Sequence, residues 1–315
     1  MKPALKILLC VSLGAGLVCA ASGVGFTRDP ANVQKAAPQL AGKLTSLNKQ
    51  RSVLLDRHGK RVLLKSKVVL REGLLEMLCC LSQTKEHESV LAVDARAFVI
   101  HAALLAVGAK PGHPVQFSPK FEPPSGQTID IFLQWADEKG KLHRVKAQQW
   151  IRHATHRFYA AQLKKRPPGL TIPKMSELFY DERNKELSWF GHMTKDQRDQ
   201  LLELSKDAQY RKAIRGFFQQ SQPKKMKHEW VFAGSDTFVD EETGEKFYEA
   251  EQGDVICLAN FPSAMIDVGA QSSASGKSNL LFEADTDKIP PVGTKVTIEL
   301  VPAISKKSAA DKTKK

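Results

Sequence analysis

Short apolar segments separated by turn residues run along most of this chain. Residues 52–56 and 61–70 are rich in valine and leucine and flank the turn RHGK. Residues 129–135 alternate apolar and polar side chains, which is the period of a strand with one buried face, and the turn DEKG follows them. Such pairs of arms around turn residues predict hairpins. The chain is therefore constrained to a β-rich core rather than a bundle of helices.

One helix is expected inside that core. Asp94 is a favourable N-cap for residues 95–107, and Gly108 with Pro111 marks the end of the helix. Because this helix is apolar on nearly all sides, we expect it to be buried.

The segment 148–227 has a different character. Residues 150–162 are predicted as a helix, residues 178–190 as a short hairpin, and residues 195–205 and 207–220 as two further helices. We interpret the segment as a mainly helical insertion or subdomain. The predicted fold class is thus α+β: a β-rich core of hairpins with one buried helix, plus this insertion.

The N-terminus predicts export. Lys2 and Lys6 precede an apolar run at 7–18, and small residues then offer a cleavage site before Ala21. The run is too short for a transmembrane span, and no later segment of the mature chain is long enough. Lipid anchoring through Cys19 is less favoured, because bulky residues precede it. We therefore expect a periplasmic or extracellular protein.

The predicted organisation has four parts. Residues 1–20 are a signal peptide and residues 21–50 a flexible tether. Residues 51–302 form the folded domain with its insertion, and residues 303–315 are a disordered basic tail.

Cysteine usage argues against a disulfide framework. Cleavage before Ala21 leaves Cys79, Cys80 and Cys257, and an odd number leaves at least one thiol unpaired. The apolar residues before Cys79 and Cys80 indicate buried small side chains, while pairing of one of them with Cys257 stays open. These scattered cysteines cannot supply a Cys₄ set, so no iron–sulfur cluster is expected. Any other cofactor stays unknown from the sequence.

Positive charge is concentrated in one part of the chain. The formal net charge is +13, and residues 139–175, the acid-free stretch, contain no aspartate or glutamate. Its basic residues are Lys139, Lys141, Arg144, Lys146, Arg152, Arg157, Lys164, Lys165, Arg166 and Lys174. In an exported protein such a stretch favours anionic polysaccharide or a membrane surface as partner, and nucleic acid is not expected. A solvated basic face is the simpler alternative. His153 and His156 have a spacing that suits one metal, but no nearby carboxylate or cysteine completes the ligand set.

The most chemically capable segment is the KEHE segment, Lys85-Glu86-His87-Glu88. As the start of a short helix, its carboxylates would be favoured by exposed backbone amides. As part of a pocket, His87 or Glu88 would serve as general base, metal ligand or ligand contact. The spacing is not the HExxH of zinc proteases, because Leu91 stands where a second histidine is required. Both interpretations stay open, and His87 with Glu88 is only a weak candidate for a metal site.

Two more polar residues lie on framework segments. His101 is on the predicted helix, where a hydrogen-bonded core role is the simpler interpretation unless folding brings it beside the KEHE segment. Ser235 is not at a nucleophile elbow, because Ala233 and Thr237 stand where that motif requires glycines. Ser235 is most simply a turn residue at the end of a strand.

Three groups of residues carry a family resemblance. They are Lys85-Glu86-His87-Glu88; His101-Ala102-Ala103-Leu104-Leu105 with Gly108 and Pro111-Gly112; and Trp230-Val231-Phe232-Ala233-Gly234-Ser235 followed by Tyr248 and Ala250. Together they resemble the YdjY domain, found in bacterial and usually exported proteins. The resemblance runs from about Arg51 to Pro302 and skips 148–227. It implies export, and it brings no activity, substrate or cofactor with it.

These observations favour an exported, non-catalytic binding or accessory module. Its candidate ligand-binding residues are Lys85, His87, Glu88, His101 and Ser235. One alternative is a metal-dependent or acid/base hydrolase that uses His87 and Glu88, although no established catalytic motif supports it. The other alternative is an envelope protein that binds an anionic polymer or lipid through its basic insertion.

Overall fold

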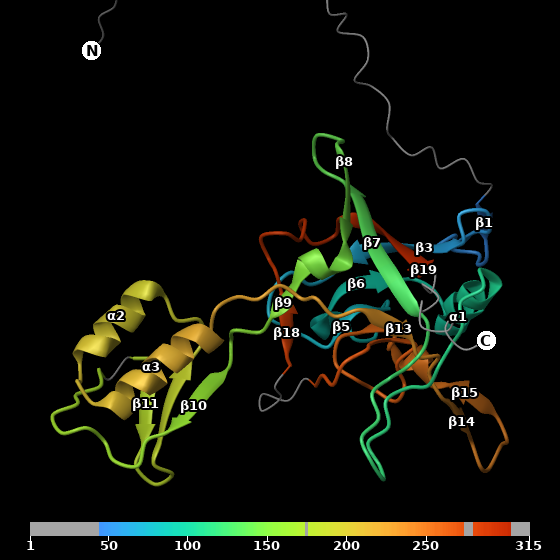
Figure 1. Ribbon diagram of the computed structural model, residues 1–315. Coiled ribbons are helices and arrows are strands. Elements are labelled where there is room, and N and C mark those ends of the chain that lie inside the picture. Colours follow the sequence, from blue (N-terminus) through green and yellow to red (C-terminus); the bar gives the residue numbers. More distant parts are fainter. Residues whose placement is uncertain (1–43, 174–175, 274–279, 304–315) are drawn as a thin grey trace, which may run out of the picture. The chain divides into compact units, whose positions relative to one another are not determined.

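The computed structural model describes residues 44–173, 176–273 and 280–303 (Figure 1). The predicted signal peptide, residues 21–43 of the predicted tether and the tail from residue 304 lie outside these residues. Within the described ranges, no helix is both long enough and apolar enough to cross a membrane.

The main feature is a closed β-barrel of eight strands, so the fold is β-rich and α+β in class, as expected. In order around the barrel these strands are β3 (Arg61–Val68), β19 (Lys295–Pro302), β7 (Thr128–Ala136), β13 (Trp230–Phe232), β17 (Ile266–Val268), β16 (Ile256–Cys257), β5 (Met77–Leu81) and β6 (Ser89–Val93). The pairing of β6 with β3 closes the circle. Closure leaves no free edge along these strands, which removes the usual template for aggregation.

Strand β3 can close the barrel because it is long enough to serve two partners on one side. Its first half, from Arg61 to Leu64, pairs with β2 (Val53–Asp56), and its second half, from Ser66, pairs with β6. The predicted hairpin around residues 57–60 is therefore confirmed. Strand β1 (Thr45–Ser46) extends the sheet beyond β2, and β8 (Leu142–Lys146) pairs with β7 as the second predicted hairpin.

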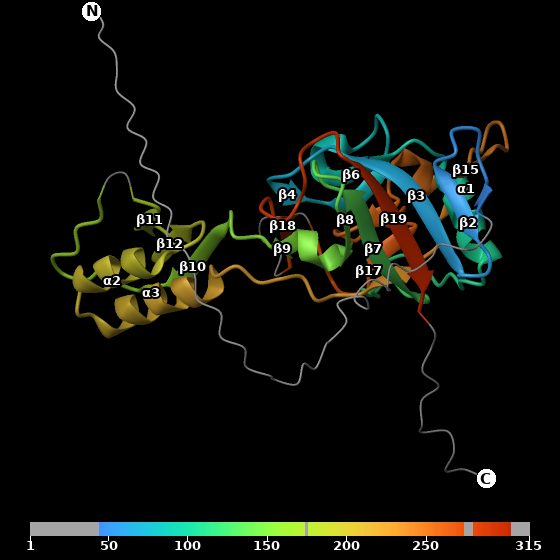
Figure 2. The same ribbon diagram turned by 90° about the horizontal axis from the view of Figure 1, so that it is seen from above.

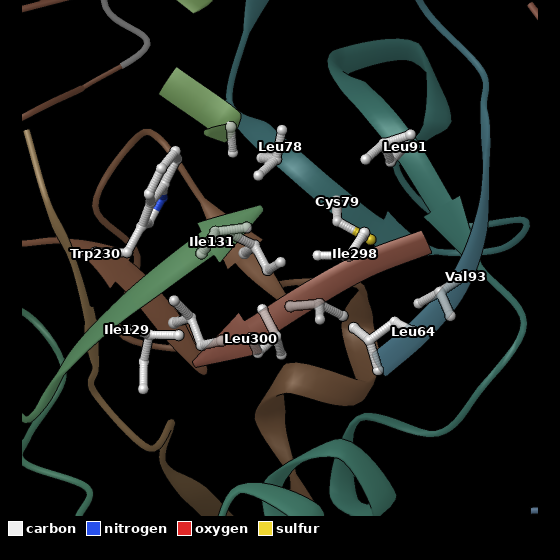
Figure 3. Packing of buried hydrophobic residues seen from close by; sticks show 14 of the residues in the cluster. Leu64, Leu78, Cys79, Leu91, Val93, Ile129, Ile131, Trp230, Ile298 and Leu300 are labelled. Atoms are coloured by element: carbon white, nitrogen blue, oxygen red, sulfur yellow. The ribbon is translucent and has the colours of Figure 1, made fainter. Parts of the chain in front are cut away.

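Aliphatic side chains, Cys79 and Trp230 pack together in the hydrophobic core of the barrel region (Figure 3). The labelled residues are Leu64, Leu78, Cys79, Leu91, Val93, Ile129, Ile131, Trp230, Ile298 and Leu300, and each is buried. The Trp230 indole donates a hydrogen bond from Nε1 to the Cys257 carbonyl, 2.9 Å away, so its only polar atom is satisfied. Burial of each leucine or isoleucine contributes about 1.5–3 kcal/mol, which makes this cluster the main source of stability.

Helix α1 (Ala97–Ala106) corrects the prediction of a helix buried on all sides. Ala97, Ile100 and Leu104 are buried against the core, whereas Phe98 is 59% exposed and Leu105 47% exposed. The buried side chains of the helix join the same hydrophobic cluster as the barrel strands, while its opposite face is exposed, so the helix buries one face only. The N-cap is also Arg96 rather than Asp94, and no side chain caps the helix start.

Several short elements complete the barrel region. Strands β4 (Leu74–Leu75), β18 (Phe282–Ala284) and β9 (Ile151–His153) form a small sheet, and β14 (Thr237–Val239) pairs with β15 (Lys246–Tyr248). The single-turn helices are η1 (Glu86–Glu88), η2 (Ala147–Trp150) and η3 (Glu249–Gln252).

A second hydrophobic cluster lies within residues 158–222. It is built from β10 (Phe158–Gln162), β11 (Leu178–Asp181), β12 (Glu186–Phe190), α2 (Lys195–Glu203) and α3 (Ala208–Gln220). The hairpin and the two helices lie where the sequence predicts them. The helix predicted over 150–162 is wrong, because this segment forms η2, β9 and β10. Tyr159 is buried between exposed Phe158 and exposed Ala160, which is the alternation of a strand.

All three described cysteines are buried and free. The pairing with Cys257 that the sequence left open is therefore absent from this structure. Burial raises the pKa of both Cys79 and Cys257 well above the ordinary thiol value, so neither forms a thiolate readily at neutral pH.

Candidate functional site

The KEHE segment forms the tight connection between two neighbouring parallel strands, β5 and β6. Residues 86–88 form one turn of 3₁₀-helix, η1, and no side chain caps its start. Thr84 donates from Oγ1 to the Leu81 carbonyl at 2.7 Å. Glu86 accepts a hydrogen bond at Oε1 from the Gln83 amide, 3.1 Å away. These local bonds hold the turn and decide where its longer side chains point.

Lys85 points inward from this turn to a buried carboxylate. Its Nζ lies 2.7 Å from Oδ1 of Asp254, whose side chain is 1% exposed, and 4.9 Å from the centre of the Phe261 ring. The other carboxylate oxygen of Asp254 accepts a hydrogen bond from Ser263 Oγ at 2.5 Å. Burial opposes the charge on Lys85, but the hydrogen bond and the charge of Asp254 outweigh it and raise its pKa. Lys85 is thus held as a cation.

Two glutamates flank this ion pair. Burial raises the pKa of Glu76, and the negative charge of Glu88 raises it further, while Lys85 acts in the opposite direction. The Glu76 amide also donates to the Glu88 carbonyl at 3.1 Å, which fixes the two backbones side by side. Glu88 is therefore part of a partly buried group of acids around Lys85, which the sequence did not predict.

His87 does not join this group. Its side chain is 77% exposed, and its Nε2 lies 3.8 Å from Oε2 of Glu88, a neighbour in the same turn. An exposed imidazole beside an adjacent carboxylate has the geometry of a solvated surface residue. The structure therefore separates His87 from Lys85, although they are only two residues apart.

His101 lies among aromatic side chains on the inner side of α1. Its Nδ1 is 2.8 Å from the Tyr248 hydroxyl, which in turn donates to the Gly234 carbonyl at 2.9 Å. Because the hydroxyl has a single proton and uses it on Gly234, it must accept from Nδ1–H of His101. The Phe232 ring contacts the imidazole edge-on, with ring centres 4.9 Å apart. Burial lowers the pKa of His101, so this histidine is neutral at neutral pH.

Ser235 is a turn residue whose side chain is fully engaged. Its φ of 59° is in the left-handed region, and so is the 98° of Gly234, where an added Cβ would lie 3.0 Å from Pro111 Cβ. Ser235 Oγ donates to the Ser263 carbonyl at 2.8 Å and accepts from the Ala250 amide at 3.1 Å. The hydroxyl is therefore a structural link and carries no partner base.

The structure thus brings three of the five predicted residues into one network. Lys85 is linked through Asp254 and Ser263 to Ser235, and Ser235 adjoins the turn at Gly234 that holds Tyr248 and His101. Glu88 borders this network at Glu76, and His87 stays outside it.

Asp254 and Ser263 were missed in the sequence because their partners lie far along the chain. Asp254 stands at the start of the apolar segment 255–258, and this is the one signal that could have marked it. A carboxylate that enters an apolar strand needs a buried cation or donor.

Asp267 is a further buried carboxylate, on strand β17. It has no exposed surface, and its Oδ2 has no hydrogen-bond partner among the described residues. Burial raises its pKa to about 7, against hydrogen bonds from Asn260 and the Val268 amide that lower it. At neutral pH this group is therefore close to half protonated.

The described residues form no metal centre. Within the described part of the chain, no group of three or more histidine, cysteine, aspartate or glutamate side chains is placed to hold an ion. His153 lies against the Phe282 ring, and His156 Nδ1 lies 3.1 Å from Oε2 of Glu283. The two histidines therefore make different contacts, His153 at the end of β9 and His156 after it.

Three cations of the acid-free stretch are paired with carboxylates from other parts of the chain. Arg144 lies 2.9 Å from Glu299, and Arg152 lies 2.7 Å from Glu283. Lys146 lies 3.3 Å from Asp130. Glu299 and Glu283 are each 2% exposed, so Arg144 and Arg152 face buried acids, whereas the Lys146–Asp130 pair lies at the surface.

Comparison with known families agrees with the segments that form the barrel. The model of the YdjY domain matches residues 53–164 and 204–301, which is well over half of the chain. The chain belongs to the YdjY domain family. The two matched segments contain Lys85, His101, Ser235 and Asp254. The unmatched part, 165–203, is narrower than the 148–227 that the resemblance in the sequence skips. Neither the curated proteins nor the solved structures contain a match.

Proposed function

We propose that this member of the YdjY domain family is an exported, non-catalytic binding or accessory module. The network around Lys85 is the observation that supports the absence of catalysis in this proposal. Lys85 is paired with Asp254 at 2.7 Å, and both the donor and the acceptor capacity of Ser235 Oγ are used on backbone groups. Residue types that could perform chemistry are thus consumed in holding loops of the barrel together.

The arrangement of His87 and Glu88 argues against the hydrolase alternative. General acid–base or metal-assisted hydrolysis needs several polar groups that converge on one substrate atom in a concave site. His87 is 77% exposed and approaches only Glu88, at 3.8 Å. Glu76 and Lys85 lie on the buried side of Glu88, away from the exposed imidazole, and no described group of three or more histidine, cysteine, aspartate or glutamate side chains is placed to hold a metal ion.

The strand cations of the acid-free stretch give little support to an envelope-binding role. Arg144, Lys146 and Arg152 already face Glu299, Asp130 and Glu283. Cations neutralised in this way attract an anionic polymer less than the sequence suggests.

The domain organisation forms part of the same proposal. Residues 1–20 serve as the signal peptide and residues 21–50 as the tether. The segment 148–227 contains an added subdomain, and the separate hydrophobic cluster of residues 158–222 supports that assignment.

A sedimentation experiment tests the binding role. The exported chain is purified and mixed with isolated bacterial cell envelopes, and the bound fraction is measured against protein concentration. We expect saturable binding with no release of soluble envelope fragments. The double variant His87→Ala/Glu88→Gln should behave in the same way. Absence of saturable binding would contradict a binding module. Fragment release that disappears in the double variant would instead establish the hydrolase.

A further inference from the structure

Strands β3 and β19 lie side by side in the barrel wall (Figure 2). A groove crosses their outer face. Its volume is about 1070 Å³, which is room for several sugar rings. The lining includes the exposed cations Arg51, Lys65, Lys67 and Lys295. Glu86 of the KEHE segment and Asp94 contribute its two carboxylates.

The cations are gathered by the register of the two strands. Lys295 lies directly opposite Lys67, and Thr297 lies opposite Lys65, whose Nζ donates to Thr297 Oγ1 at 2.9 Å. Lys65 and Lys67 are two residues apart, so both side chains project from the same face of β3. Like charges directly opposite each other on paired strands destabilise a sheet. The groove therefore concentrates positive charge at a cost to folding.

This charge is not neutralised within the described part of the protein. None of Arg51, Lys65, Lys67 and Lys295 lies within ion-pair distance of a described carboxylate, in contrast to Arg144 or Arg152. Glu86 Oε1 is occupied by the Gln83 amide. Four cations against two carboxylates leave the groove with a net positive charge, which makes it complementary to an anion with several charged groups.

We propose that this groove binds a segment of anionic polysaccharide. This assignment rests on the proposed role as an exported binding module, and anionic polysaccharide would be the ligand of that module. The other lining residues supply amide and hydroxyl groups, from Gln50, Ser82, Gln83 and Thr297, which suit the hydroxyls of a sugar chain.

The same lining disfavours two other anionic partners. Single-stranded nucleic acid is usually held by aromatic side chains that stack on its bases, and the lining residues of this groove include no aromatic side chain. Peripheral binding to a bilayer uses exposed apolar side chains, whereas the apolar lining here consists of Ala92 and Val296, both buried in their strands.

Isothermal titration of the full exported chain with polygalacturonate oligosaccharides tests the groove. Three variants in one chain, Lys65→Gln, Lys67→Gln and Lys295→Gln, remove the groove charge. Lys139→Gln, Lys164→Gln and Lys165→Gln make the matched control, because they remove the same charge from exposed lysines of the acid-free stretch. We expect the groove variant to bind about tenfold more weakly or worse and the control to stay within about twofold of the wild type. Neutral dextran of similar length should not bind.

Three outcomes of the titration would overturn the groove assignment. These are no binding of polygalacturonate, an equal loss of affinity in the control variant, and tighter binding of an oligothymidylate or of phosphatidylglycerol vesicles at equal charge concentration. Thermal unfolding of each variant checks that the fold is retained. If the groove variant binds envelopes as well as the wild type does, the groove is not the binding site, but the proposed role as a binding module stands. If the wild-type protein does not bind envelopes, both the groove assignment and the binding module are contradicted.

Discussion

The two basic regions of this protein differ in whether their cations are paired with carboxylates. The acid-free stretch is the most basic segment along the sequence, yet its strand cations lie against carboxylates from β7, β18 and β19. The groove draws its cations from separate segments, at Arg51, Lys65, Lys67 and Lys295, and none of them is paired with a described acid. Charge density along a chain and charge density on a surface are thus different quantities. The pairing of strands decides which cations remain available to a partner.

The buried acid Glu299 offers the largest test of this difference. It accepts hydrogen bonds from Arg61 at 2.5 Å and from Arg144 and Gln134 at 2.9 Å. We expect Glu299→Gln to lower the free energy of unfolding by about 3 kcal/mol, because it leaves two guanidinium groups without their shared anion. Urea denaturation measures the change, and exposed Glu138→Gln is the control. A loss under about 1 kcal/mol would show that the stretch does not depend on its acids.

The pH dependence of the same substitution follows from the pKa of Glu299. Burial would raise this pKa, but hydrogen bonds from Arg144, Arg61 and Gln134 outweigh it and lower the pKa below 4.5. A lowered pKa gives stability above the unfolded value that is lost as pH falls through the folded value. The wild type should therefore lose its advantage over Glu299→Gln as the pH falls from about 5 to 3. A constant difference across this range would contradict the ion pair.

The buried acid Asp267, which has no described cation beside it, should give a pH dependence of stability with the opposite sign. The pKa of Asp267 is raised to about 7, so the folded state holds this proton more tightly than the unfolded chain does. Its contribution is present at low pH and is lost as pH rises through 7, a decrease of about 2 kcal/mol between pH 5 and pH 7. Asp267→Asn should remove that decrease while retaining the hydrogen bonds from Asn260 and Val268. Denaturation of both proteins at the two pH values decides the point, and an unaltered decrease in the variant would contradict it.

Relief of repulsion within the groove should give the smallest effect. Lys67→Thr removes one of two directly opposed ammonium groups and should raise the free energy of unfolding by about 0.5 kcal/mol at low salt. The gain should vanish at 1 M salt, where the screening length is about 3 Å. Lys139→Thr, at an exposed position, should leave stability unchanged. Destabilisation by Lys67→Thr would show that the lysine serves the fold.

Local patterns in the sequence predicted much of the fold. Hairpin turns and alternation placed β2 with β3 and β7 with β8, and the family resemblance selected segments that the barrel contains. Closure of the barrel through β3 and β6 could not be predicted, because the pairing depends on residues distant in sequence. The error at 150–162 has a different cause: its apolar residues also fit a helical spacing, but Tyr159 alternates with exposed neighbours in β10.

The candidate site was predicted in its residues more than in its geometry. Lys85 and Ser235 do share a network, but the acid that connects them, Asp254, lies far from both in sequence. Side-chain direction in a turn as short as η1 depends on local hydrogen bonds, so Lys85 could point inward and His87 outward. The sequence of this short segment therefore could not show that Lys85 is directed inward and His87 outward.

The comparison of the two basic regions is tested most directly by two triple variants with equal charge change. Lys65→Gln/Lys67→Gln/Lys295→Gln neutralises the groove, and Arg144→Gln/Lys146→Gln/Arg152→Gln neutralises the paired cations of the acid-free stretch. The free energy of unfolding in low salt should rise by about 0.5–1 kcal/mol for the groove variant and fall by about 2 kcal/mol or more for the other. A change of the same sign in both variants would contradict the account.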